Sequence, residues 1–122
     1  MSDSVTLKGI EPEKSAALID VIKERLRQDA KWGEQNWDPQ TYLSILMEEV
    51  GEAAKEANDL HWVSIPKPDE FGVEQMRRNR LRNERVQVTA VALAMVECLD
   101  RGKWKWPIHP DAQQADKRGP EL

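Results

Sequence analysis

The sequence contains few of the residues that build disulfides, zinc sites or membrane spans. Cys98 is the single cysteine, which excludes a disulfide within the chain, and its apolar surroundings predict a buried, unreactive thiol. His61 has no second histidine or cysteine at ligand spacing, so we expect no zinc site. No apolar run reaches the roughly 20 residues of a membrane span, and the N-terminus has no basic and apolar signal segment. We therefore expect a cytoplasmic protein with no membrane partner.

An excess of basic residues is also missing. The 122 residues carry a formal net charge of −4, whereas a protein that coats nucleic acid would have a basic surface. The sequence has neither an internal repeat nor a Gly-rich loop that would cradle phosphate groups. Its length fits one domain, and a domain this small can depend on association for part of its stability. We expect no nucleic-acid partner.

The most distinctive stretch that is present is acidic, LMEEVGEAAKEA at residues 46–57. Apolar residues recur on one side at helical spacing: Leu43, Leu46, Met47, Val50, Ala54 and Ala57. Carboxylates fall on the opposite side: Glu48, Glu49, Glu52, Glu56 and Asp59. Like charges at this spacing repel, and Lys55 is the one basic residue between Pro39 and Leu60. Either the segment is an ordinary acidic surface helix, or a divalent cation such as Mg²⁺ compensates the charge.

Helical periodicity and end signals predict an all-α protein, a bundle of about three to four main helices completed by oligomerisation. Asp38 suits an N-cap and Pro39 the first helical position, while Gly33 and Gly102 are placed to end helices. The expected helices cover residues 12–32, 39–60 and 69–101. The expected organisation is a flexible N-terminal arm at 1–11, a helical domain at 12–101 and a C-terminal tail at 102–122.

The third expected helix is apolar on almost every side from Val86 to Leu99, which predicts burial and a subunit interface. Glu84 and Gln87 enter this helix on the same strip as Val91. A carboxylate on a buried strip needs a partner. That partner is either an arginine or an ion shared with Glu49 and Glu52.

The segment QDAKWGEQNW at residues 28–37 combines aromatic, amide and basic side chains around a turn. Either its tryptophans fix the loop to the core, or its aromatic faces and amides bind a nucleobase. The basic stretch from Arg77 to Arg85 is either a solvated face or supplies one or two contacts to phosphate. If the functional alternatives hold, the substrate-binding residues would be Lys31, Trp32, Asn36 and Arg82.

Two of these segments resemble the motifs of a known family. Glu48-Glu49-Val50-Gly51-Glu52 matches the EExxE motif of the MazG-like, all-α nucleoside triphosphate pyrophosphohydrolases. Glu84-Arg85-Val86-Gln87, which opens the apolar helix, resembles that family's second motif, ExxD. Residues 28–36 are similar to a segment of small stand-alone members. The resemblance covers about residues 17–101, so we expect the domain at 12–101 to be MazG-like.

The resemblance implies a helical dimer or tetramer that hydrolyses NTP or dNTP to the monophosphate and pyrophosphate, with sites near subunit contacts. The cofactor would be Mg²⁺, with Mn²⁺ tolerated. Carried over to this sequence, Glu49, Glu52 and Glu84 would be metal ligands. Glu48 would be an auxiliary ligand or would orient the attacking water. These four residues are the predicted catalytic set.

Gln87 departs from the family motif, which has aspartate at this position. A neutral amide is a poorer Mg²⁺ ligand than a carboxylate, so Gln87 would be a weak metal ligand. A literal ExxD at Glu97–Asp100 lies at the end of the apolar run rather than before it, so we prefer Glu84 and Gln87. The alternatives to an enzyme are a non-catalytic oligomeric helical module that binds nucleotides or a protein, and a structural bundle whose acidic face meets a basic partner.

Overall fold

The computed structural model describes residues 6–64 and 72–106, and these residues form three helices and no strand. They are α1 (Pro12–Trp32), α2 (Pro39–Ser64) and α3 (Val73–Arg101). The predicted all-α class is therefore confirmed. α2 extends four residues past its predicted end, because no helix-breaking residue follows Leu60 before Pro66. The segment 65–71, which includes the predicted Pro-rich loop, lies outside the described residues.

The helix ends have the predicted capping residues. Asp38 caps α2, since its Oδ1 accepts hydrogen bonds from the backbone N–H groups of Gln40 and Thr41, both at 3.0 Å. Its Oδ2 also accepts a 2.6 Å bond from the Thr41 hydroxyl. Gly33 and Gly102 follow α1 and α3 with φ of 72° and 65°, a conformation that costs glycine little. The start of α2 and the ends of α1 and α3 thus follow from local sequence.

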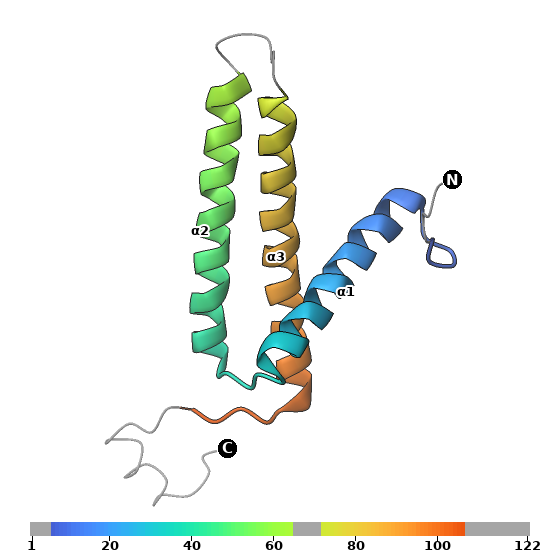
Figure 1. The fold of residues 1–122 in the computed structure, drawn as a ribbon. Helices are drawn as coiled ribbons and strands as arrows, with labels where there is room; N and C mark the ends of the chain where they lie inside the picture. The colour runs from blue at the N-terminus through green and yellow to red at the C-terminus, as the bar shows by residue number, and fades with distance from the viewer. Residues whose placement is uncertain (1–5, 65–71, 107–122) are drawn as a thin grey trace, which may run out of the picture.

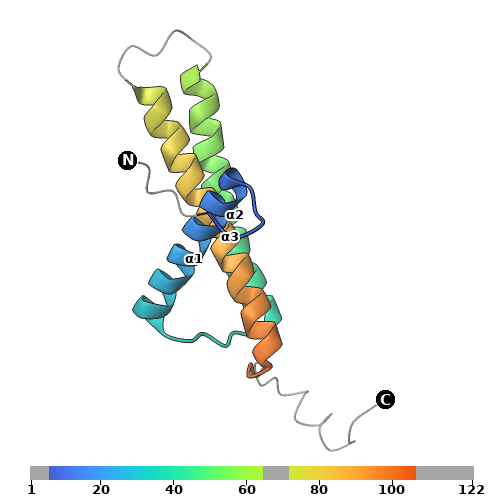
Figure 2. The ribbon, with the colours of Figure 1, turned by 90° about the vertical axis from the view of Figure 1, so that its right-hand side faces the viewer.

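The three helices form an open arrangement rather than a closed bundle. Figure 1 shows α2 and α3 side by side as an antiparallel hairpin, with α1 inclined against α3. The view from the side in Figure 2 shows the same hairpin with α1 crossing it. Within the described part of the chain, the backbones of α1 and α2 do not pack closely on each other. One side of the hairpin is consequently left without a helical cover in the single chain.

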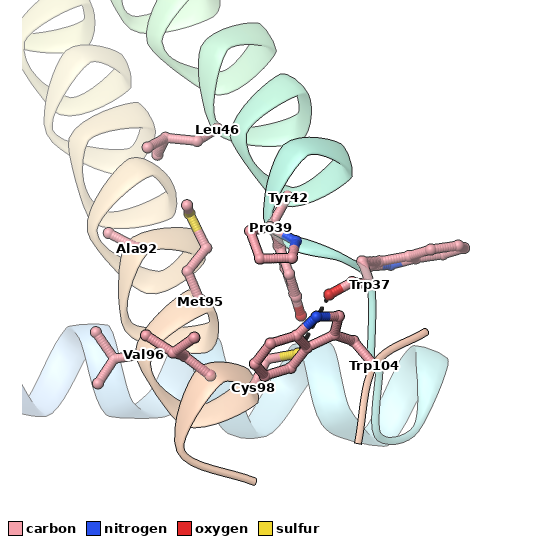
Figure 3. A pocket seen from close by; sticks show the side chains of 10 residues that line it. Trp37, Pro39, Tyr42, Leu46, Ala92, Met95, Val96, Cys98 and Trp104 are labelled. Atoms are coloured by element: carbon pink, nitrogen blue, oxygen red, sulfur yellow. Dashed lines mark hydrogen bonds between the residues drawn. The ribbon is translucent and has the colours of Figure 1, made fainter. Parts of the chain in front are cut away.

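A small core joins α2 to the C-terminal half of α3. Tyr42, Val91, Ala94 and Cys98 are buried together, with Ile45, Leu46, Met95 and Trp104 packed around them. Cys98 is only 2% exposed, as predicted for an inert thiol, and its Sγ lies 3.4 Å from the Trp37 carbonyl oxygen. Figure 3 shows the apolar hollow beside this core, with Pro39 and Trp104 across from Met95 and the ring of Trp37 pointing away from it.

A buried arginine attaches α1 to α3. The Arg25 side chain is almost inaccessible, and its Nε donates a 2.7 Å hydrogen bond to Glu97 Oε2 on α3. The same guanidinium also donates to Gln28 Oε1 at 3.1 Å and to Asp29 Oδ1 at 3.0 Å. Polar contacts, together with the buried Val21, therefore fix how α1 sits on the hairpin.

The apolar side predicted for the acidic helix is largely exposed. Leu43 and Met47 are 51% and 58% exposed, while α2 meets α3 through Tyr42, Ile45 and Leu46. The buried face is thus rotated relative to the sequence pattern, and this rotation turns Glu49 inward. On α3, Val96 and Leu99 are also exposed, so the expectation of a helix buried all round does not hold in the single chain.

The described part of the N-terminal arm is tied to α1. The backbone N–H of Leu7 donates a 3.0 Å hydrogen bond to the buried Ser15 hydroxyl, and Ile10 N–H bonds to Leu7 carbonyl in a turn. The arm is therefore hydrogen-bonded to α1 from Leu7 onward, and its flexibility stays a prediction. Among the described helices, none combines the length and the apolar character needed to cross a membrane.

Candidate metal centre

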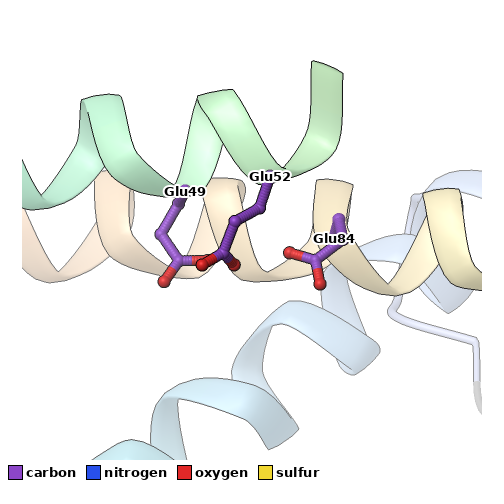
Figure 4. A group of neighbouring side chains, drawn as sticks. All are labelled: Glu49, Glu52 and Glu84. Atoms are coloured by element: carbon purple, nitrogen blue, oxygen red, sulfur yellow. The ribbon is translucent and has the colours of Figure 1, made fainter. Parts of the chain in front are cut away.

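Three carboxylates predicted to bind metal converge between α2 and α3. Glu49 and Glu52 are one helical turn apart on α2, and Glu84 reaches them from α3. One carboxylate oxygen of each lies within 4.8 Å of the others. Figure 4 shows the three side chains together on the side of the hairpin along which α1 passes. The packing of α2 on α3 therefore brings both predicted motifs into one cluster.

The carboxylates in this cluster have unsatisfied oxygens. Among the described residues, no hydrogen-bond partner reaches the buried Oε2 atoms of Glu49 and Glu84. The same holds for Oε2 of Glu56, which lies one turn beyond Glu52 on α2. A buried acceptor without a partner is costly, and it is uncommon in folded proteins. The predicted alternative of an arginine partner for Glu84 does not describe this environment.

The electrostatics of the cluster disfavour the ionised acids in the metal-free protein. Burial raises the pKa of Glu49, and the charges of Glu52, Glu24 and Glu48 raise it further. The pKa of Glu84 is raised by burial and then by the charges of Glu52 and Glu49. A cation placed among these oxygens would reverse both effects, because it favours the charged form of each ligand.

The donor set fits Mg²⁺ or Mn²⁺. Mg²⁺ binds oxygen at about 2.0–2.1 Å, so two oxygens on one ion can be at most about 4.2 Å apart. The three carboxylates are within 4.8 Å of one another, and small rotations of their side chains would close the difference. Three carboxylates with nearby open space also suit an ion that retains several waters.

The remaining predicted metal and catalytic residues lie near the cluster but outside it. Glu48 is exposed on α2, next to Glu49 in sequence. Gln87 is half-buried, one turn after Glu84, and lines a hollow of about 310 Å³ together with Glu49. The roles of Glu48 and Gln87 stay predictions. The alternative motif residue Glu97 is instead bonded to Arg25 near the other end of α3, which favours Glu84 as the site residue.

The hollow beside Glu49 also contains part of the predicted nucleobase segment. Trp32, Gln35 and Trp37 line it together with Glu49 and Gln87. Trp32 and Trp37 are 51% and 45% exposed, so neither is buried in the core. Lys31 places its Nζ 4.6 Å from the centre of the Trp32 ring, a cation–π contact that orients the aromatic face. The structure thus places aromatic and amide side chains next to the carboxylates.

Asn36 and Arg82, two of the four predicted substrate-binding residues, have partners within the protein. Asn36 accepts a 3.0 Å hydrogen bond from Arg101 Nε and donates one of 2.9 Å to Glu34, so its amide fixes the loop to α3. Arg82 pairs with Asp20 at 2.8 Å. It also lines a second, polar hollow between α1 and α3, which includes Lys23, Arg27 and Gln87.

Glu24 is a residue of this region that sequence reasoning missed. It lies on α1, lines both hollows, and its charge acts on Glu49. No local pattern distinguishes it from the other charged residues of α1. Only the crossing of α1 over α3 brings it near the acidic motifs.

Comparison of the chain with family models, curated proteins and solved structures gave no match.

Proposed function

We propose that this protein is a metal-dependent nucleoside triphosphate pyrophosphohydrolase, which converts NTP or dNTP to the monophosphate and pyrophosphate with Mg²⁺ or Mn²⁺. One observation carries the proposal: Glu49, Glu52 and Glu84 converge from two helices, and two of them have buried oxygens that no hydrogen-bond partner reaches in the described part of the chain. The same residues form the motifs that resemble the MazG-like family. A solvated acidic face would not need to bring these carboxylates together against their repulsion.

The proposed reaction assigns separate tasks to the residues present. Bound Mg²⁺ supplies positive charge for the phosphate oxygens and lowers the pKa of water. Glu49, Glu52 and Glu84 hold it, while the exposed Glu48 orients the attacking water and accepts its proton. Water attacks the α-phosphorus, and the bond from that phosphorus to the oxygen bridging it to the β-phosphorus breaks. The products are a monophosphate and pyrophosphate.

The hollows on either side of Gln87 suggest how a nucleotide lies. The hollow with Trp32 and Gln35 offers an aromatic face and amide groups to a base, beside Glu49. The polar hollow offers Lys23 to the phosphate groups, whereas Arg27 and Arg82 in the same hollow are paired with Glu24 and Asp20. A triphosphate spanning the two would pass the carboxylate cluster.

We also propose that the functional form is a homodimer or homotetramer. The exposed apolar side chains on α2 and α3, including Met47 and Leu99, lie on the hairpin that carries the carboxylates. A second hairpin placed against them would bury apolar surface, at about 25 cal/mol per Å². It would also close the side of the hairpin that α1 leaves uncovered.

The test is a screen of natural and modified NTPs and dNTPs, with released pyrophosphate as the readout. We expect Mg²⁺-dependent release of pyrophosphate, abolished by Glu52→Gln and unaffected by Glu13→Gln. Glu13 is exposed in the first turn of α1, so this control makes the same charge change away from the cluster. Absence of pyrophosphate release for every nucleotide would contradict the proposal.

One observation favours a second function, a non-catalytic nucleotide-binding module. Gln87 is neutral where the family motif has aspartate, and it lines both hollows. Such a module would bind a nucleotide without turning it over. Calorimetric titration with the non-hydrolysed product monophosphate, alongside the turnover assay, separates the two functions, because only the enzyme releases pyrophosphate.

A further inference from the structure

We propose that Glu24 of α1 supplies the negative charge that the metal centre lacks at Gln87. This inference rests on the proposed metal-dependent function, and it concerns a helix that carries neither of the two acidic motifs. Three carboxylates converge at the cluster, and the fourth predicted metal residue, Gln87, is a neutral amide. The question is therefore whether another carboxylate faces the same space.

Glu24 and Gln87 lie on opposite walls of the same space. Both line the polar hollow between α1 and α3, and both line the hollow that includes Glu49. The Glu24 side chain is only 12% exposed, so it is directed into the protein rather than into solvent. A negative charge on α1 thus lies across from the position where α3 has none.

Neighbouring side chains hold Glu24 in place and keep it ionised. Arg27 donates hydrogen bonds of 2.8 Å from Nε to Glu24 Oε1 and of 2.6 Å from Nη2 to Oε2. Gln28 adds a 3.2 Å bond to Oε2. The bond from Arg27 lowers the pKa of Glu24, whereas the pKa of Glu49 is raised first by burial, then by Glu52 and only after them by Glu24. Glu24 is therefore held as a carboxylate in the hollow that it shares with Glu49.

Glu24 is a positioning residue rather than one of the converging ligands, since its carboxylate is not part of the three-membered cluster. Mg²⁺ usually retains several waters, and a carboxylate beyond the ligands can accept hydrogen bonds from them. Partners of this kind typically change metal affinity by about 10-fold to 100-fold. The docking of α1 on α3 through Arg25 sets the place of Glu24.

The experiment is calorimetric titration of the nucleotide-free full-length protein with Mn²⁺. We expect Glu24→Gln to weaken Mn²⁺ binding by at least about 10-fold. Adding Gln87→Asp to this variant should recover most of the loss, because it returns one negative charge to the same space from α3. Glu24→Asp, which keeps the charge, should bind within a few-fold of wild type, and Glu13→Gln should bind as wild type does.

The outcomes separate this inference from the proposed function. If Glu24→Gln binds Mn²⁺ as wild type does while Glu52→Gln loses binding, the role of Glu24 is wrong and the metal centre stands. A loss that Gln87→Asp does not recover, or an equal loss in Glu24→Asp, also overturns the role, because charge is then not what Glu24 supplies. If wild type itself does not bind Mn²⁺, the proposed metal centre is wrong. Circular dichroism of each variant identifies losses due to unfolding, and Glu24→Asp decides if Glu24→Gln does not fold.

Discussion

At the scale of single residues, the carboxylates of α2 repel one another and do not stabilise the metal-free protein. Glu52 is three residues from Glu49 and four from both Glu48 and Glu56, so it takes part in three repulsive pairs along one helix. Its carboxylate also belongs to the converging cluster. Glu52 therefore costs the metal-free protein stability, as expected for a residue that serves the proposed metal centre.

Glu52→Gln should therefore raise the stability of the metal-free protein while abolishing Mg²⁺-dependent hydrolysis. Removing Glu52 from its three repulsive pairs, each worth about 0.2–0.5 kcal/mol, should stabilise α2 by about 1 kcal/mol. Urea denaturation in the presence of a chelator measures the change, and pyrophosphate release measures activity. A less stable variant, or unchanged turnover, would show that Glu52 is a structural residue.

Asp38 provides a pH-dependent prediction away from the metal centre. Hydrogen bonds from the Thr41 hydroxyl and then from backbone N–H groups lower the pKa of Asp38 below its value in the unfolded chain, about 3.9. A carboxyl group whose pKa is lowered by folding stabilises the fold at pH values above its pKa in the unfolded chain. This contribution disappears as the pH falls through its pKa in the folded protein. Wild type should thus exceed Asp38→Asn in stability near pH 7.

The urea midpoints of wild type and Asp38→Asn should converge as the pH is lowered from about 4 to about 2, because the protonated aspartate loses the advantage of its charge. Asparagine keeps the shape and can still cap the helix, so the pair isolates the charge. A difference that stays constant over this range would mean that the ionised cap contributes nothing.

The site was partly predictable from single residues. EExxE and Glu84 could be recognised because their spacing within helices is local, and the structure brings Glu49, Glu52 and Glu84 together. Glu24 could not be recognised, because its proximity to Glu49 depends on the angle at which α1 crosses α3. The substrate contact of Asn36 stays a prediction, and the bonds of its amide to Arg101 and Glu34 could not be recognised because local sequence does not reveal these partners.

At the scale of the elements, helix ends were predictable and helix faces were not. Proline, glycine and the Asp38 cap act within one turn, so α1 and α2 begin where the sequence indicates. The prediction of the contact face of α2 is wrong by a rotation about the helix axis, because the apolar arc containing Leu43 and Met47 does not reveal which residues meet α3. Tyr42 of α2 packs with Cys98 of α3 instead, so tertiary packing determines which face of α2 is buried.

Arg25 should be the residue on which the docking of α1 depends most. Arg25→Met keeps the apolar part of the side chain but removes bonds to Glu97, Gln28 and Asp29. Hydrogen bonds to charged groups contribute about 1.5–3 kcal/mol, so we expect a loss of about 2 kcal/mol in the free energy of unfolding.

Hydrogen exchange should localise that loss. In Arg25→Met, amides of α1 should exchange faster while those of the α2–α3 hairpin stay protected. Arg78→Met is the matched control, since Arg78 is exposed and pairs with Glu74 within one helix; such a pair contributes about 0.3–0.5 kcal/mol. Equal effects of the two variants would mean that the buried guanidinium does not hold α1 in place.

At the scale of the whole molecule, the exposed apolar side chains lead us to expect an obligate oligomer. Leu43 and Met47 on α2, with Val96 and Leu99 on α3, are all more than half exposed in the single chain. Light scattering at micromolar concentration should give at least twice the mass of one chain. Met47→Lys should lower that mass or reduce stability, whereas Ser44→Lys, an exposed polar position on α2, should not. A stable, well-folded wild-type monomer would contradict this expectation.

The central claim is that Glu49, Glu52 and Glu84 form a divalent cation site, and anomalous scattering from crystals grown with Mn²⁺ tests it most directly. We predict an anomalous peak between the three carboxylates, with ligand oxygens about 2.1–2.2 Å away, near the distances found for Mg²⁺. The peak should be absent in Glu52→Gln grown in the same solution. A wild-type crystal with no peak among these carboxylates at millimolar Mn²⁺ would contradict the account.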